Sequence, residues 1–281
     1  MNLVKSPLNY VGGKYKLLPQ ILPLFPKDID TFYDLFGGGA NVAVNVNANK
    51  IVCNDINTKV MEILISLKKY NTDYLLAMID EFIEHYELSK TNRDGFLKLR
   101  ESYNSAKHKN PIKLYTLICY AFNYQIRFNN KGEYNMPFGK DRSSFNEVLR
   151  KKFIAFCDRL HSIDIRFTNC DFEDFREIEI CENDFVYLDP PYYNSVACYN
   201  ENGGWGEQDE IDLKCFLNWL TNLNIRWALS NNVSVNPELI DFANRYGYHI
   251  HYLSANYGNC NYHKKDKTED KEVLITNYVT V

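Results

Sequence analysis

The chain has 281 residues, of which 45% are hydrophobic and 24% charged, and its formal net charge is −4. A chain of this length holds one large α/β domain with a sizeable insertion, or two modest domains. The net charge argues against a protein that coats nucleic acid regardless of sequence, although a local basic surface is enough for a more selective nucleic-acid enzyme.

The eight cysteines form neither a C-x-x-C pair nor a spacing typical of zinc ligands. Cys53, Cys119 and Cys157 stand in apolar stretches, which is typical of reduced, buried thiols. The sequence contains no signal-peptide core and no apolar run of the length that a membrane span needs. We therefore expect a cytoplasmic protein that holds no metal.

Short β-branched and aromatic runs alternate along the chain with helical patterns, which predicts a doubly wound α/β sheet. Apolar residues at three- and four-residue spacing predict helices between residues 58 and 107 and over 112–122. Further helices are expected over 40–46, 209–223 and 237–246. The predicted strands cover residues 31–35, 50–53, 165–168, 184–188, 226–229, 248–253 and 272–278.

The predicted strands lie on both sides of a mostly helical block. The economical interpretation is a sheet domain formed by residues 1–55 and 163–281, interrupted by a helical insertion of residues 56–162. Within the insertion, the stretch 123–145 is rich in Asn, Gly and charged residues, and we expect it to form a hairpin.

A strand, a glycine turn and the start of a helix follow one another over residues 31–46. Glycines at positions 37–39 let the backbone approach a ligand closely. About twenty residues later the second strand ends at Asp55, whose carboxylate can accept both ribose hydroxyls of an adenosine-bearing cofactor. A tight turn and a helix N-cap are the alternatives for these two features. Their order favours a nucleoside cofactor, and the glycine spacing disfavours dinucleotides and nucleoside triphosphates.

Gly12, Gly13 and Lys14 form a second glycine turn, which is followed by the start of a helix. Such a turn suits an anionic group, for example a methionine carboxylate. On its own, a lysine at this place is more often solvated at the surface.

The predicted strand 184–188 runs directly into Asp189, Pro190, Pro191 and Tyr192. Two prolines cannot continue the ladder, so the chain leaves the sheet at its carboxyl edge, where the active sites of α/β proteins lie. Since proline has no N–H, nearby carbonyls can point into a pocket. A rigid turn alone does not account for an acid, two prolines and an aromatic ring in sequence.

These four residues resemble the D-P-P-Y motif of DNA N6-adenine methyltransferases. The whole chain resembles the Dam-type family, in which the Gly-Gly-Lys segment, the glycine motif, a target-recognition insertion and the catalytic motif follow in this order. The resemblance implies a Rossmann-like methyltransferase sheet with a mostly helical target-recognition insertion, S-adenosylmethionine as cofactor and double-stranded DNA as partner. It also implies cofactor contacts from Tyr10, Gly12, Lys14, Asp34, Phe36, Gly37, Gly39, Asp55, Asp171, Phe172 and Asp189.

The resemblance further implies a direct methyl transfer without a metal. The Asp189 carboxylate and the Pro190 carbonyl would accept the two hydrogens of the adenine amine, which frees the nitrogen lone pair for attack on the sulfonium methyl. Tyr192 would stack on the base, which has to leave the duplex. The Ser-Asn-Asn run at 230–232 resembles a further motif around the pocket.

Arg, Asn and Lys interleave with aromatic residues across 122–139, a pattern that suits base-edge readout and stacking. An ordinary surface hairpin is the alternative. The segment resembles the recognition hairpin of Dam-type enzymes that act on GATC, which implies that Arg127 reads a guanine edge, Phe122 wedges between base pairs and Pro137 touches a thymine methyl. The expected DNA-binding residues are Phe122, Asn123, Arg127, Asn129, Lys131, Asn135 and Pro137.

Residues 199–208 differ from what the GATC enzymes have after their catalytic motif, so GATC remains a hypothesis for the target. Basic residues at 150–152 and 263–265 are candidate phosphate contacts, and a solvated surface explains them equally well.

Three functions are alternatives to adenine methylation. They are N4-cytosine methylation, for which the motif usually begins with Ser, protein glutamine methylation, and a catalytically silent DNA-binding protein, which would carry a damaged motif. A separate cognate restriction endonuclease and the oligomeric state stay open.

Overall fold

The computed structural model describes residues 2–193, 204–254 and 271–280. Part of the stretch 199–208 and the candidate phosphate contacts at 263–265 lie outside the described residues. The chain forms two compact units. Unit 1 consists of Met1–Gly13, Gly38–Asn45 and Asn57–Asn169, and unit 2 consists of Lys14–Gly37, Val46–Ile56 and Cys170–Val281.

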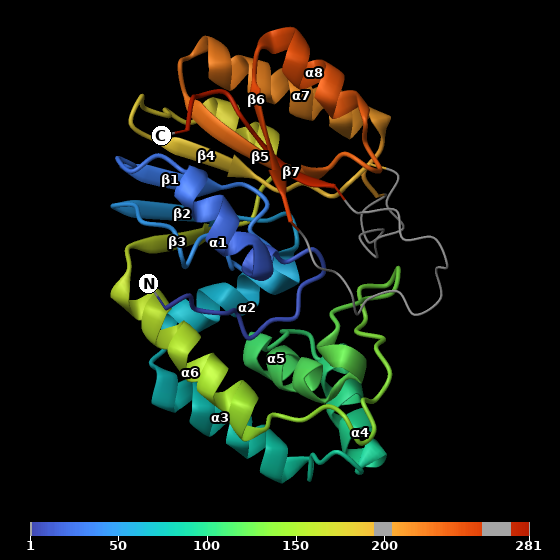
Figure 1. The fold of residues 1–281 in the computed structure, drawn as a ribbon. Coiled ribbons are helices and arrows are strands. Elements are labelled where there is room, and N and C mark those ends of the chain that lie inside the picture. Colours follow the sequence, from blue (N-terminus) through green and yellow to red (C-terminus); the bar gives the residue numbers. More distant parts are fainter. Residues whose placement is uncertain (1, 194–203, 255–270, 281) are drawn as a thin grey trace. The chain divides into compact units, whose positions relative to one another are not determined.

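Seven strands of the described residues form one mixed sheet in the order β3-β2-β1-β4-β5-β7-β6 (Figure 1). β1, β2, β4 and β5 run parallel, and β7 pairs antiparallel with both β5 and β6. Every predicted strand is present, which confirms the predicted Rossmann-like α/β class. The strands are β1 (Thr31–Asp34), β2 (Lys50–Asn54), β3 (Ile165–Thr168), β4 (Phe185–Leu188), β5 (Arg226–Asn232), β6 (His249–Leu253) and β7 (Glu272–Thr276).

Alternation along the strands divides the core of unit 2 between two faces of the sheet. On one face, Val186 and Trp227 pack with buried side chains of α7 and α8. On the other face, the Phe25 ring lies 4.8 Å from the Phe185 ring. Each large apolar side chain buried in this way contributes about 1.5–3 kcal/mol. The helices described in unit 2 are η1 (Lys14–Leu17), α1 (Leu18–Ile21), η2 (Leu22–Leu24), η4 (Phe172–Glu177), α7 (Glu207–Asn222) and α8 (Glu238–Tyr246).

Unit 1 is mostly helical, and each of the five α-helices described in it begins with an asparagine N-cap. The side chains of Asn57, Asn71, Asn92, Asn110 and Asn146 accept hydrogen bonds from backbone N–H groups of the first turn. Such a cap stabilises its helix by about 1 kcal/mol. The helices are α2 (Thr58–Lys69), α3 (Thr72–His85), α4 (Arg93–Ser105), α5 (Pro111–Tyr120), η3 (Phe122–Tyr124) and α6 (Glu147–Ser162).

The sequence predicts a helix over residues 40–46, and this prediction is wrong. The segment forms consecutive turns, and Ala40 has a left-handed φ of 60°. The Asn45 side chain exchanges two hydrogen bonds with the Val4 backbone, at 2.8 and 2.7 Å, and Asn41 Oδ1 accepts one from Ser6 N at 3.0 Å. Asparagine side chains that bind backbone groups compete with helical hydrogen bonding. Here they tie the turns to the N-terminal segment instead.

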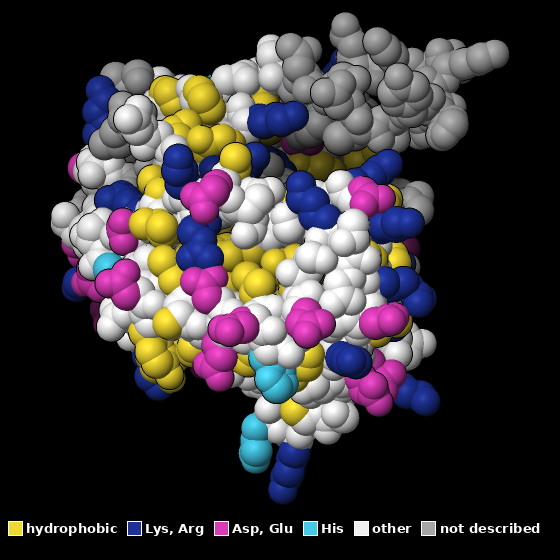
Figure 2. All heavy atoms as spheres, turned by 90° about the horizontal axis from the view of Figure 1, so that it is seen from below, with side chains coloured by type: hydrophobic (Ala, Val, Ile, Leu, Met, Phe, Trp, Pro, Cys, Tyr) yellow, Lys and Arg dark blue, Asp and Glu magenta, His cyan; other side chains and the backbone are white. Residues whose placement is uncertain are grey.

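The surface of the molecule carries charges of both signs. On the face shown in Figure 2, basic and acidic side chains lie interspersed with apolar ones. Arg150, a candidate phosphate contact, forms an ion pair with Asp80, and its guanidinium lies 4.9 Å from the centre of the Phe145 ring. Among the helices of the described residues, none combines the length and the apolar character that a membrane crossing requires.

Candidate active site and recognition hairpin

The carboxyl ends of β1, β4 and β5 lie at one edge of the sheet because these three strands are parallel. Asp34 at the end of β1 is level with Tyr187, and Leu188 is level with Leu229 of β5. The Tyr187 hydroxyl lies 2.7 Å from Ser230 Oγ, and both groups are buried. The D-P-P-Y motif therefore leaves β4 beside the Ser-Asn-Asn end of β5.

A buried ion pair joins the start of η1 to the D-P-P-Y motif. Lys14 Nζ lies 2.7 Å from Asp189 Oδ1, and only 2% of the Lys14 side chain is exposed. The same ammonium lies 5.1 Å from the centre of the Tyr192 ring, within the range of a cation–π interaction. Lys14 is thus not the surface lysine that its position alone would favour.

Glu272 binds the Tyr192 hydroxyl, and sequence analysis did not predict it as a site residue. Tyr192 donates a hydrogen bond to Glu272 Oε2 at 2.8 Å. Glu272 is the first residue of β7, pairs in register with Asn232 of β5 and is buried. In the sequence, a glutamate ahead of an apolar run is a weak signal, because most such glutamates are solvated.

Burial and neighbouring charges control the protonation of the motif. Burial raises the pKa of the Asp189 carboxyl; the Lys14 ammonium opposes this rise, and the Asp55 carboxylate adds to it. Burial and the negative charges of Asp189 and Glu272 also raise the pKa of Tyr192 well above its usual range. The phenol therefore stays protonated at neutral pH and can donate to Glu272.

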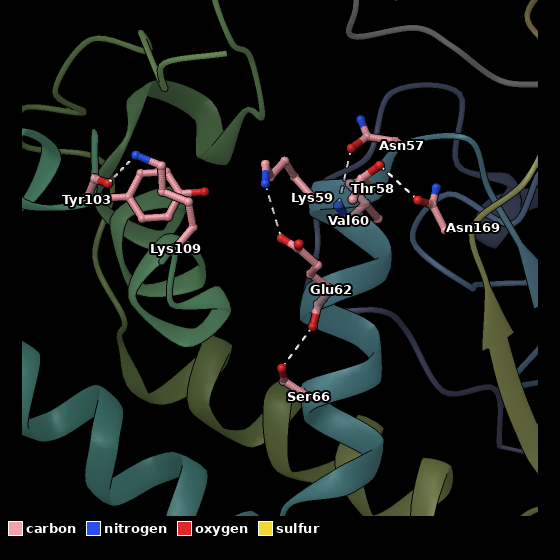
Figure 3. Close-up of polar contacts among 9 residues, drawn as sticks. All are labelled: Asn57, Thr58, Lys59, Val60, Glu62, Ser66, Tyr103, Lys109 and Asn169. Atoms are coloured by element: carbon pink, nitrogen blue, oxygen red, sulfur yellow. Dashed lines mark hydrogen bonds and ion pairs between the residues drawn. The ribbon is translucent and has the colours of Figure 1, made fainter. Parts of the chain in front are cut away.

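Asp55 follows β2 directly and is buried. The side chain of the preceding Asn54 donates to the Cys170 carbonyl at 3.0 Å, which fixes the tip of the strand. Helix α2 begins with Asn57 as its N-cap, and Asn57 Oδ1 accepts from a first-turn backbone N–H at 3.2 Å (Figure 3). Helix capping therefore does not account for Asp55.

Gly37 lies where a side chain has no room. Its N–H donates to the Asn54 carbonyl at 2.7 Å, and a Cβ at this position would collide with the Cys53 sulfur. The same Cβ would lie 3.6 Å from the Asp34 carboxyl carbon. The glycine thus lets the backbone pass close to the tips of β1 and β2, as a turn near a ligand requires.

Phe36, Phe172 and Trp205 form an aromatic cluster in unit 2. The ring centroids of Phe36 and Phe172 are 5.4 Å apart, and the Trp205 ring lies 5.7 and 6.1 Å from them. Trp205 belongs to the stretch that departs from the GATC enzymes, and sequence analysis did not predict it as a site residue. Asp171 caps η4, since its carboxylate accepts from a first-turn backbone N–H at 2.9 Å.

Three of the predicted cofactor residues, Tyr10, Gly12 and Gly39, belong to unit 1. Gly12 and Gly38 have left-handed φ values of 79° and 49°. A Cβ on Gly38 would lie 2.7 Å from the Tyr10 ring, and one on Gly39 would lie 3.5 Å from the Tyr10 Cβ. The middle and last glycines of the motif thus pack closely on Tyr10.

Residues 121–139 fold back on themselves in unit 1 as an antiparallel hairpin with two isolated bridges, Ala121–Phe138 and Phe128–Tyr134. We call this segment the recognition hairpin. Asn129 shapes its tip, because Asn129 Oδ1 accepts from the N–H groups of Lys131 at 3.0 Å and Glu133 at 2.9 Å. An open hollow of about 640 Å³ lies along the hairpin between Arg127 and Asn135.

The predicted DNA-binding residues all lie on the recognition hairpin. Phe122 lies at the surface ahead of a strained turn, in which Asn123 and Tyr124 have left-handed φ values of 54° and 56°. Such conformations cost about 1–3 kcal/mol each. The Arg142 guanidinium lies 5.7 Å from the centre of the Phe122 ring. Phe122, Asn123, Arg127, Lys131 and Pro137 are exposed, and Asn129 and Asn135 are half-buried.

Comparison with known proteins places the chain in a family. The family model described as D12 class N6 adenine-specific DNA methyltransferase matches residues 10–270. The type II methyltransferase M.FokI of Planomicrobium okeanokoites is 48% identical over 98% of this chain, and the modification methylase StsI of Streptococcus sanguinis is 44% identical over 99%. A DNA adenine methylase of Salmonella typhi is 26% identical over 69% of this chain and 66% of its own.

The chain spans only 43% of the length of M.FokI and 43% of that of the StsI methylase. The matched residues nevertheless include the glycine motifs, the recognition hairpin and the D-P-P-Y motif. The chain therefore belongs to the D12 class N6 adenine-specific DNA methyltransferase family.

Proposed function

We propose that the protein is a site-specific DNA methyltransferase that transfers the methyl group of S-adenosylmethionine to N6 of adenine in double-stranded DNA. The observation that carries the proposal is the position of Asp189 at the carboxyl edge of the sheet, ion-paired with the buried Lys14. The family and the names of the relatives support the same reaction.

The residues at the tips of β1 and β2 fit this cofactor. S-adenosylmethionine supplies an electrophilic methyl group on a sulfonium sulfur. We assign its ribose hydroxyls to Asp55, which is buried at a strand tip and not used as a helix cap, and its adenine to Phe36 and Phe172. Asp34, Gly37 and Asp171, together with Tyr10, Gly12 and Gly39 of unit 1, complete the proposed cofactor set.

The D-P-P-Y motif activates the amine of adenine, whose nitrogen lone pair is delocalised into the ring. The Asp189 carboxylate and the Pro190 carbonyl accept the two amine hydrogens, which draws the nitrogen towards a tetrahedral geometry. Because positive charge develops on this nitrogen, the two acceptors stabilise the transition state more than the ground state. Lys14 keeps the Asp189 carboxylate ionised and oriented, so we place Lys14 with the catalytic group.

Tyr192 stacks on the adenine, which leaves the duplex at a cost of a few kcal/mol. A hydrogen bond of 2.8 Å to Glu272 and the ammonium of Lys14 over its ring keep Tyr192 in one orientation. We therefore propose Glu272 as a positioning residue that acts through Tyr192.

The recognition hairpin reads the DNA in this proposal, within a target-recognition domain of residues 56–162, and residues 1–55 and 163–281 form the catalytic domain. Arg127 reads a guanine, Phe122 wedges between base pairs and Pro137 touches a thymine methyl. Asn123 and Lys131 contact the DNA backbone or the bases. GATC is the leading hypothesis for the target. We place the reaction in the cytoplasm, with a separate restriction endonuclease as a candidate partner in the cell.

Methylation of a duplex pool tests the proposed function. The protein is incubated with S-adenosylmethionine and duplexes of random sequence, which are then sequenced for modified bases. N6-methyladenine in one sequence context is the expected result. N4-methylcytosine would change the assigned base, and sequence-specific binding without any methylation would make the protein a silent DNA-binding protein.

A further inference from the structure

The side chain of Arg127 is held by Asn135, which faces it across the recognition hairpin. Asn135 N donates to the Arg127 carbonyl at 3.2 Å, which pairs the two backbones. Arg127 Nε donates to Asn135 Oδ1 at 2.8 Å, and Arg127 Nη2 donates to the Asn135 carbonyl at 3.3 Å. The guanidinium of an exposed arginine thus has a fixed direction.

Helix α4 fixes the backbone on both sides of Asn135. Asn104 donates to the Tyr134 carbonyl at 3.0 Å and accepts from Tyr134 N at 2.9 Å. Arg100 Nη1 donates to the Met136 carbonyl at 3.0 Å. Tyr134 and Met136 are both buried, whereas Asn135 between them points outward to Arg127. Hydrogen bonds from α4 therefore anchor the backbone from which the Asn135 side chain extends.

The hydrogen bonds to Asn135 decide which edge of the guanidinium remains for a ligand. Nε and Nη2 form the side-on edge, and both donate to Asn135. The end-on edge consists of Nη1 and the second hydrogen of Nη2, two donors that point the same way. Guanine presents two acceptors, O6 and N7, to such a pair of donors in the major groove.

We propose that Asn135 is a positioning residue that presents the end-on edge of Arg127 to a guanine, rather than a DNA contact in its own right. The proposal rests on the proposed DNA methyltransferase function. An arginine that is already ordered loses less side-chain entropy when it binds. Asn135 therefore sharpens the preference for one base at one position, and it affects turnover on other sequences much less.

The test compares Asn135→Ala, Asn135→Asp and Arg127→Ala in the full chain, with Asn130→Ala at the exposed tip as a control. The random duplex pool is scored for methylation and, without cofactor, for binding, so base preference is measured even if methylation fails. Asn135→Ala should reduce the guanine preference about fivefold or more at the position that Arg127→Ala flattens. Asn135→Asp keeps the Oδ1 acceptor for Arg127 and should restore most of that preference.

The rescue by aspartate separates positioning from direct contact. If Asn135 bound a phosphate or base through its Nδ2 group, Asn135→Asp would lose this donor and add a charge that repels DNA. It would then weaken binding to all sequences at least as much as Asn135→Ala. That result would overturn the proposal. If Arg127→Ala removes the base preference at one position of the target but Asn135→Ala does not, only the positioning role of Asn135 fails. If Arg127→Ala flattens no position, guanine readout by the hairpin fails as well. Thermal unfolding of each variant checks that the chain still folds.

Discussion

The carboxyl edge of the sheet in unit 2 and the recognition hairpin of unit 1 fix their charged side chains by different means. At the edge, Lys14 and Asp189 form a charged pair with little solvent exposure. In the hairpin, the exposed Arg127 is held by the neutral side chain and carbonyl of Asn135. Breaking a buried pair leaves a charge without compensation and costs several kcal/mol, whereas a neutral hydrogen bond contributes about 0.5–1.5 kcal/mol. The buried pair is therefore the more costly of the two arrangements to break.

The largest effect is expected from a change in the buried Lys14–Asp189 pair. Asp189→Ala should lower kcat by at least about a hundredfold, the scale for losing one preorganised transition-state partner. Turnover is measured at saturating S-adenosylmethionine and DNA, so that a change in binding does not enter the comparison. Glu238→Ala, which removes a mostly exposed carboxylate that pairs with Lys214, is the control. Residual turnover within a few-fold of wild type would remove Asp189 from its role.

A smaller effect is expected for the cofactor. Asp55→Ala should weaken binding of S-adenosylmethionine by about 1.5–3 kcal/mol, the usual value of hydrogen bonds to a charged acceptor. Asn57→Ala is the control for stability, because it removes the N-cap of α2 at a cost of about 1 kcal/mol. Equal dissociation constants for wild type and Asp55→Ala would show that Asp55 has only a structural role.

The Lys14–Asp189 ion pair also predicts how kcat/KM depends on pH. Asp189 acts as a carboxylate and its folded-state pKa is raised, so kcat/KM should fall as the pH drops through that raised pKa. Lys14 lowers this pKa, and Lys14→Met should therefore move the acid limb of kcat/KM to higher pH. The measurement is a pH–rate profile of both proteins. An acid limb that stays in place would mean that Lys14 does not control the protonation of Asp189.

The smallest effect is expected at the tip of the recognition hairpin. Asn129→Ala removes the acceptor of the Lys131 and Glu133 N–H groups and should destabilise the tip by about 1 kcal/mol. Hydrogen exchange at these two amides should accelerate about fivefold, while kcat at saturating DNA stays unchanged. A lower kcat with unchanged exchange would mean that Asn129 contacts the DNA during catalysis instead of shaping the tip.

Much of the fold could be predicted because its signals are local. The apolar runs of the strands, the glycine turns and the abrupt end of β4 at Asp189 are visible in short windows of sequence. The prediction of a helix over residues 40–46 failed because the contacts that decide this segment are distant in sequence. Its apolar spacing suits a helix, but Asn41 and Asn45 bind the backbone of Ser6 and Val4, about forty residues away.

The candidate site could be predicted only in part, for the same physical reason. Lys14 and Asp189 belong to motifs, but their contact across 175 positions is a tertiary contact that neither motif predicts. Glu272 and Trp205 lie in no motif, and each was missed. Their positions follow from the register of β7 beside β5 and from the packing of Trp205 on Phe36. Tertiary contacts of this kind leave no periodic signal in the chain.

The asparagine N-caps of unit 1 have a consequence for long-range electrostatics. Aspartate caps a helix about as well as asparagine and interacts more favourably with the positive helix N-terminus. Five aspartates at positions 57, 71, 92, 110 and 146 would nevertheless add five negative charges to the unit that carries the recognition hairpin. Under the proposed function, their field would repel the DNA phosphates and slow association, most strongly at low salt. Neutral caps give unit 1 stable helices without that repulsion, in a chain whose net charge is already negative.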